Sequence, residues 1–201
     1  MINTLSNKTD TSSAKVTWQM RSQRGFWGSL LWLLMPLLAI LYGLLFSSGG
    51  DIFMHWGLAL SAVLLALAIF DFRKTPIWTQ CIGVMGIVTL AFIFFLQGAS
   101  HLLQSAALTY LAYDILGQWA EVWSFRLFFY GWGVAVLLRD SQGKTRVLGV
   151  IAVLIFLAVE IYRYGITAWG APPSPWLRAV YLVPFVWLLL ESAKKSAGSK
   201  P

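Results

Sequence analysis

The sequence predicts an all-α integral membrane protein, a six-span transmembrane helix bundle with an outer interfacial helix. Two observations lead to this prediction. First, 58% of the 201 residues are hydrophobic and only 11% are charged, whereas a soluble domain carries about 25% charged residues. Second, the charges fall between apolar runs long enough to cross a bilayer, which takes about 20 residues. The net charge of +7 therefore reflects basic loops, and no nucleic-acid partner is expected.

Six apolar runs define the predicted spans. A polar and basic segment, residues 1–25, precedes them and predicts a largely disordered cytoplasmic tail. A second basic tail, residues 191–201, follows them. Gly83 and Gly86 lie within the third run, where small residues allow helix backbones to approach closely. The six spans cover residues 26–46, 52–70, 77–97, 119–138, 147–169 and 176–190.

The segment 98–118 is less apolar than the runs around it. A helical wheel places Tyr110, Tyr113 and Asp114 on one side and aliphatic residues on the other. This amphipathic pattern favours a helix that lies in the outer membrane interface over a seventh span.

The basic residues set the orientation of the bundle. With six spans, the two tails and the turns after the second and fourth spans lie on one side, and all four carry Lys or Arg. The opposite connections, 47–51, 98–118 and 171–175, contain no Lys or Arg. The positive-inside rule then places both termini in the cytoplasm. We expect a bacterial inner membrane protein whose partners are membrane lipids and other membrane protein subunits.

Two charges, Glu160 and Arg163, lie within the fifth predicted span. A charge inside a bilayer is costly, so it needs a partner, a water path or a function. At 1.5 Å per residue, Glu160 lies roughly 13 Å below the outer boundary, and Arg126 on the preceding antiparallel span lies roughly 10 Å below it. This similar depth predicts an Arg126–Glu160 ion pair. A pair that only fixes the helix register is an equal alternative to a binding site.

These charges predict a polar site in the outer half of the bundle. The arginines would hold an anionic group, and Glu160 would balance them or take up a proton. The spacing identifies no catalytic residue. The predicted binding residues are Arg126, Glu160 and Arg163 at the centre, with Asp114, His101 and Arg178 at the mouth.

Such a site predicts a small polytopic membrane protein that binds or passes a solute, ion or lipid through an outward-opening path. Two alternatives stay open. One is a subunit or assembly factor of a larger membrane complex. The other is a membrane-embedded enzyme that acts on a lipid or isoprenoid, with Glu160 and Asp114 as acid/base groups.

No metal or cofactor is predicted. The chain has one cysteine, Cys81, and contains neither a zinc-ligand pattern nor a glycine-rich nucleotide loop. His55 and His101 fall at the outer ends of spans. Two histidines on facing helices can ligate a haem iron, and one histidine can join a carboxylate at a metal. Because neither has a second ligand at metal spacing, each is expected to bond to backbone or lipid headgroups.

Overall fold

The structure is a computed structural model. It describes residues 23–38, 41–42, 50–162 and 182–198. Every regular element in these residues is helical, which confirms the all-α prediction. The predicted tail 1–25 lies outside the described residues except for its last three positions, which begin the first described helix, 23–38.

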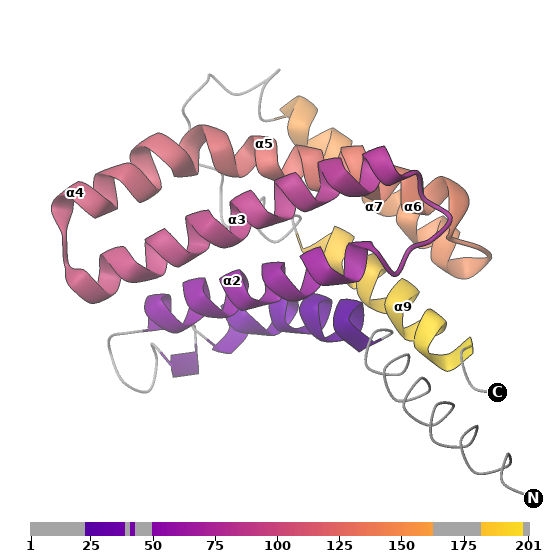
Figure 1. Cartoon of the computed structure of the whole chain (residues 1–201), viewed down its shortest axis with the longest axis horizontal. Coiled ribbons are helices and arrows are strands. Elements are labelled where there is room, and N and C mark those ends of the chain that lie inside the picture. The colour runs from indigo at the N-terminus through magenta and orange to yellow at the C-terminus, as the bar shows by residue number, and fades with distance from the viewer. Residues whose placement is uncertain (1–22, 39–40, 43–49, 163–181, 199–201) are drawn as a thin grey trace, which may run out of the picture.

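Two of the described helices, α2 (Gly50–Ile69) and α3 (Ile77–Leu103), are long and apolar enough to cross a membrane. They pack side by side as antiparallel neighbours (Figure 1). At 1.5 Å per residue, the 27 residues of α3 span about 40 Å, roughly 10 Å more than the hydrocarbon layer of a bilayer. The end of α3 therefore reaches beyond the length that a span requires.

The segment 98–118 differs from its prediction as a separate interfacial helix. The residues up to Leu103 continue α3. The chain then turns at Gln104, whose φ of 49° is in the left-handed region. The hydroxyl of Ser105 accepts a hydrogen bond from the backbone N–H of Leu108 at 3.4 Å and so caps the next helix. A new helix therefore begins after a turn of two residues, Gln104 and Ser105. The segment 98–118 forms the tip of a helical hairpin.

The second arm of this hairpin is one uninterrupted run of helix. It contains no proline, which explains why it continues through the predicted span 119–138 without a break. Two of its parts are π-helical, with i→i−5 bonds such as Glu121 N–H to the Leu116 carbonyl. Figure 1 shows the tip of the hairpin extending beyond α2. The consecutive parts are α4 (Ala106–Thr109), the π-helical η1 (Tyr110–Ala120), α5 (Glu121–Arg126), the π-helical η2 (Leu127–Gly133) and α6 (Val134–Arg139).

The two arms of the hairpin approach closely at Gly86. A Cβ atom there would lie 2.5 Å from the Ser124 carbonyl oxygen and 2.7 Å from the Phe128 nitrogen. A Cβ atom at Gly83 would lie 2.6 Å from the Cβ atom of Trp132. The structure thus confirms the close helix approach predicted from these two glycines.

The last two described helices are α7 (Lys144–Ile161) and α9 (Val183–Gly198). Gly143, with a φ of 60°, makes the tight turn into α7. The helix α9 continues well into the predicted tail 191–201, because the Ala, Lys and Glu residues there favour helix. Three predicted spans lie partly outside the described residues: 26–46, 147–169 and 176–190.

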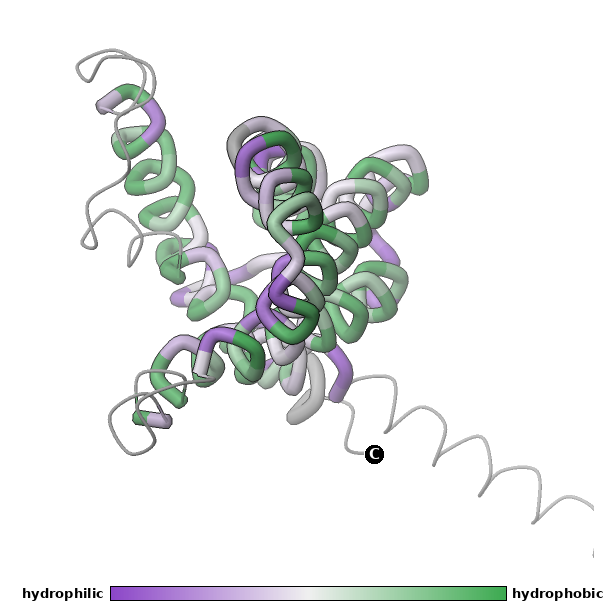
Figure 2. The backbone as a smooth tube through the Cα atoms, turned by 90° about the vertical axis from the view of Figure 1, so that its left-hand side faces the viewer, coloured by the Kyte–Doolittle hydropathy of each residue, from purple (hydrophilic) through white to green (hydrophobic). Residues whose placement is uncertain are grey.

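An aromatic core joins these helices. Trp32 of the first described helix stacks on Phe185 of α9, with ring centroids 4.2 Å apart, and meets Phe94 of α3 edge-on at 5.5 Å. In the second hairpin arm, Phe128 stacks on Trp132 at 5.2 Å. All five rings are buried. Figure 2, a view turned by 90°, shows apolar residues along most of each described helix.

Candidate functional site

The ion pair between Arg126 and Glu160 forms as predicted. Arg126 ends α5, and Glu160 lies in the last turn of α7. The Arg126 Nε atom donates a hydrogen bond to Glu160 Oε2 over 2.7 Å, and Nη2 contacts the same oxygen. Two positions 34 residues apart are therefore held together by a two-point contact inside the helical bundle.

The second carboxylate oxygen of Glu160 is not used by this pair. Glu160 is 8% exposed. Its Oε1 atom is buried and has no hydrogen-bond donor among the described residues. A buried carboxylate oxygen without a donor is costly. Among the described residues, Oε1 is therefore the oxygen of this carboxylate to which no donor is assigned.

The indole of Trp123 covers the guanidinium of Arg126. The Arg126 Cζ atom lies 4.8 Å from the Trp123 ring centroid, which is within the range of a cation–π interaction. Arg126 also directly precedes the π-helical segment η2, and π-helical segments frequently occur at functional sites. The arginine is thus held by a carboxylate and an aromatic face together.

The structure separates the predicted mouth of the site from its centre. Asp114 precedes Arg126 by twelve positions of continuous helix, a distance of roughly 15 Å or more. His101 and Asp114 instead lie together in an open groove of about 430 Å³ at the hairpin tip. Arg163 and Arg178 lie outside the described residues.

The groove at the hairpin tip is lined mainly by polar residues from both arms. The groove is open and lies on the surface of the described helices. Its lining residues are Ser100, His101, Gln104, Ala106, Thr109, Tyr110 and Asp114.

Beside this groove, a phenol joins the two histidines of the chain. The Tyr113 hydroxyl lies 2.7 Å from His101 Nε2 and 3.3 Å from His55 Nε2. The imidazole rings of His55 and His101 stack with centroids 5.5 Å apart. His55 does bond to the backbone, through Nδ1 to the Asp51 carbonyl, as predicted, but the contact of both histidines with one tyrosine hydroxyl was not predicted. His55 and Tyr113 were missed as site residues because α2 and η1 meet only through the hairpin geometry.

Burial raises the pKa of Tyr113 to about 12, with smaller contributions from the charges of Asp51 and Glu121. Tyr113 therefore remains a neutral phenol at physiological pH, with one hydrogen to donate and lone pairs to accept.

A buried carboxylate in α9 was also missed. Glu191 is 1% exposed, and its Oε2 atom has no hydrogen-bond partner among the described residues. The sequence predicts that it belongs to the cytoplasmic tail. Helical spacing could have indicated its burial, because Glu191 follows Leu188 by three positions and so lies on the same buried face of the helix.

The described residues define a class: they form an all-helical fold in which two helices have membrane-spanning length and an ion pair is packed among the helices. Among the described residues, no group of three or more His, Cys, Asp or Glu side chains is arranged to hold a metal ion. Models of known protein families, curated protein sequences and solved structures give no match to this chain.

Proposed function

We propose that this chain is a multi-pass membrane protein that binds or passes a solute, ion or lipid through a polar site in its outer half. The observation that carries the proposal is the half-used carboxylate of Glu160. Its Oε2 atom holds Arg126, while its buried Oε1 atom has no donor among the described residues. A pair that served only to join two helices would gain from satisfying both oxygens.

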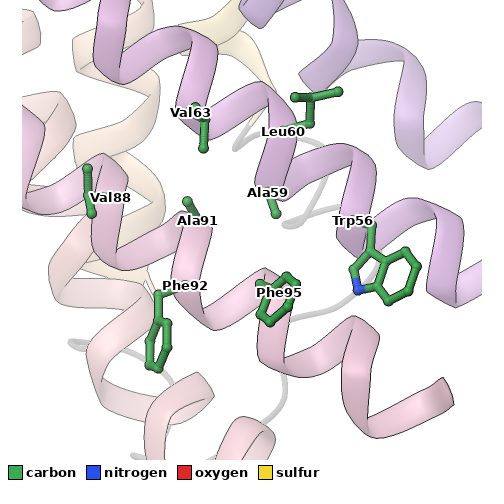
Figure 3. A pocket seen from close by; sticks show the side chains of 8 residues that line it. All are labelled: Trp56, Ala59, Leu60, Val63, Val88, Ala91, Phe92 and Phe95. Carbon is green, nitrogen blue, oxygen red and sulfur yellow. The ribbon is translucent and has the colours of Figure 1, made fainter. Parts of the chain in front are cut away.

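The surface of the described helices supports the membrane part of this proposal. Large apolar side chains point outward from several helices, for example Phe92 of α3 at 56% exposure and Leu154 of α7 at 58%. An apolar groove between α2 and α3, shown in Figure 3, is lined entirely by apolar and aromatic side chains. Such a surface suits contact with lipid tails. Six spans in a bacterial inner membrane are the arrangement that we propose.

The basic turns support the proposed orientation. The turn between α2 and α3, with Arg73 and Lys74, lies at the same end of the molecule as the turn between α6 and α7, with Arg139 and Lys144 (Figure 1). The hairpin tip at the opposite end contains no Lys or Arg between positions 98 and 118. The positive-inside rule then makes the tip external and both termini cytoplasmic.

In this arrangement Arg126 binds an anionic or polar group of the ligand, and Glu160 Oε1 accepts a proton, a cation or a ligand donor. Arg163 and Arg178 are proposed to belong to the same site because the positions of their residues in the proposed spans place them in the outer half of the membrane. His101 and Asp114 line the outer groove through which a ligand would approach.

A subunit or assembly factor of a larger membrane complex is the second candidate. The apolar groove between α2 and α3 is the observation that favours it, because a helix of another subunit fills such a groove as well as lipid does.

The two candidates predict different results when the protein is extracted in lipid nanodiscs and analysed by native mass spectrometry. The site proposal predicts a bound small molecule or lipid that is retained by the wild type and by Arg146→Ala, a control at an exposed arginine of α7. Arg126→Ala and Glu160→Gln would lose it. Identical small-molecule content in all four proteins would contradict the site proposal, and a co-purifying partner protein would then support the second candidate.

A further inference from the structure

We propose that His55, His101 and Tyr113 form a binding site for a divalent transition-metal ion of the Zn²⁺ or Cu²⁺ class. The site lies where the outer end of α2 meets the hairpin tip. It is separate from the Arg126–Glu160 pair, which joins a different part of the second hairpin arm to α7.

The position of one ring hydrogen of His55 is fixed by its neighbour. Its Nδ1 atom lies 2.7 Å from the backbone carbonyl oxygen of Asp51, and a carbonyl can only accept a hydrogen bond. Nδ1 therefore carries a hydrogen, and when the ring is neutral its Nε2 atom presents a lone pair. Metal-binding histidines are typically oriented in this way, with the second ring nitrogen donating to a carbonyl or carboxylate.

The donor atoms already lie close to the spacing of metal ligands. Bonds of about 2.0–2.1 Å to a tetrahedral ion place the ligand atoms roughly 3.3 Å apart. His55 Nε2 and Tyr113 Oη are 3.3 Å apart. His101 Nε2 lies closer to Tyr113 Oη, at 2.7 Å, and needs a small outward movement. His101 is exposed and lies two residues from the end of α3, so its ring has room to make that movement.

The three atoms that meet in the cluster can all act as metal ligands. Two imidazole Nε2 atoms face one phenol oxygen, and the phenol has one hydrogen. A metal ion can bind a lone pair of each of the three atoms, and the proton of the Tyr113 hydroxyl is released to water as the ion binds. Imidazole nitrogen is a preferred ligand of Zn²⁺ and Cu²⁺. With three protein donors, the fourth position is left for water or an external ligand that arrives through the open groove beside His101.

Gly98 holds the two histidine-bearing helices close together. A Cβ atom at Gly98 would lie 2.2 Å from the Trp56 ring. Trp56 adjoins His55, and Gly98 precedes His101 by one helical turn. The absence of a side chain at Gly98 therefore permits the approach of α2 and α3 at the level of the site.

The site can be tested directly because the chain contains only two histidines. Full-length protein without a polyhistidine tag is treated with a chelator, purified in detergent and titrated with Cu²⁺ or Zn²⁺ alone. We expect one saturable site of micromolar affinity and a Cu²⁺ electron paramagnetic resonance spectrum with nitrogen splitting from two imidazoles. His101→Gln should show splitting from one imidazole and at least about tenfold weaker binding.

Three variants act as controls. Tyr113→Phe should weaken binding less than His101→Gln, whereas Tyr162→Phe, a change at an exposed tyrosine that follows α7, should leave it unaltered. Cys81→Ser should also bind normally, which excludes the exposed thiol as the ligand. Equal affinity and equal spectra for the wild type and His101→Gln would overturn the proposal. A Tyr113→Phe variant that binds as the wild type does would overturn the assignment of the third donor.

One measurement needs only the wild type and so does not depend on how the variants fold. Diethylpyrocarbonate modifies accessible histidine rings, and mass spectrometry of the peptide that contains His101 reports the extent of reaction. Zn²⁺ should protect His101 from modification at concentrations that saturate the site. Unchanged modification of His101 at saturating Zn²⁺ would contradict the proposal.

Discussion

Glu160 holds Arg126 through Oε2 alone and keeps Oε1 buried without a donor among the described residues. This asymmetry separates two roles of the carboxylate. One oxygen joins α7 to the second arm of the hairpin, and the other remains available for binding. The contribution of the pair to stability can therefore be measured apart from its contribution to binding.

Replacing Arg126 and replacing Glu160 should lower the free energy of unfolding by different amounts. Arg126→Ala leaves a buried carboxylate without its counter-ion, so we expect it to lower the free energy of unfolding by about 3–5 kcal/mol. Glu160→Gln keeps a hydrogen-bonding side chain of the same size and should lower it less. Thermal unfolding in detergent, followed by circular dichroism, measures both. If both variants lose the same free energy of unfolding, then leaving the buried carboxylate of Glu160 without its counter-ion does not have the large cost proposed here.

Removing the aromatic cover of Arg126 should have a smaller effect. Trp123→Ala removes a ring that lies 4.8 Å from the guanidinium, and we expect a loss of about 0.5–1 kcal/mol. Trp123→Phe keeps an aromatic face and should retain most of that energy. In the Arg126→Ala background, Trp123→Ala should have little further effect. A double-mutant cycle of unfolding free energies tests this, and strict additivity would contradict the interaction.

The close contact of the hairpin arms predicts a strong effect of a single methyl group. Gly86→Ala places a Cβ atom 2.5 Å from the Ser124 carbonyl oxygen. Because this neighbour is backbone, a helix must shift, and we expect a loss of about 1–3 kcal/mol. Gly133→Ala is the matched control, since the closest atom to its Cβ would be a ring carbon of Phe129, at 3.1 Å. Equal melting temperatures for the two variants would contradict the packing described for the hairpin.

The side chain of Tyr113 at the hairpin tip should lose its proton only at strongly alkaline pH. Tyr113 has a pKa of about 12 in the folded protein and an ordinary value of 10.0. The folded state therefore holds this proton more tightly than the unfolded state. The associated stability is complete below pH 10 and is lost as the pH rises toward 12.

Phenolate absorbance measures this titration against pH. The chain has seven tyrosines, and the difference between the wild type and Tyr113→Phe isolates one of them. We expect that difference to titrate near pH 12. A difference centred near the ordinary value of 10.0 would mean that Tyr113 is not buried at the tip.

The sequence was sufficient for the helical class and for the Arg126–Glu160 pair, because depth in a helix follows directly from residue number. It was insufficient for the hairpin tip. The low hydropathy of 98–118 indicated an interfacial helix, yet the turn depends on a local cap at Ser105. The cluster of His55, His101 and Tyr113 depends in turn on where that hairpin places its two arms, which no spacing along the chain records.

A charge swap tests the central claim most directly. In the variant Arg126→Glu with Glu160→Arg, the ion pair is retained with its polarity reversed. Protein abundance and bound-ligand content are measured together in nanodiscs for the wild type, both single variants and the double variant. We predict that the swap restores abundance but not the ligand, because the free carboxylate oxygen has moved to the other helix. If the swap restores abundance and the content of bound molecules never depended on either residue, the pair only holds two helices together.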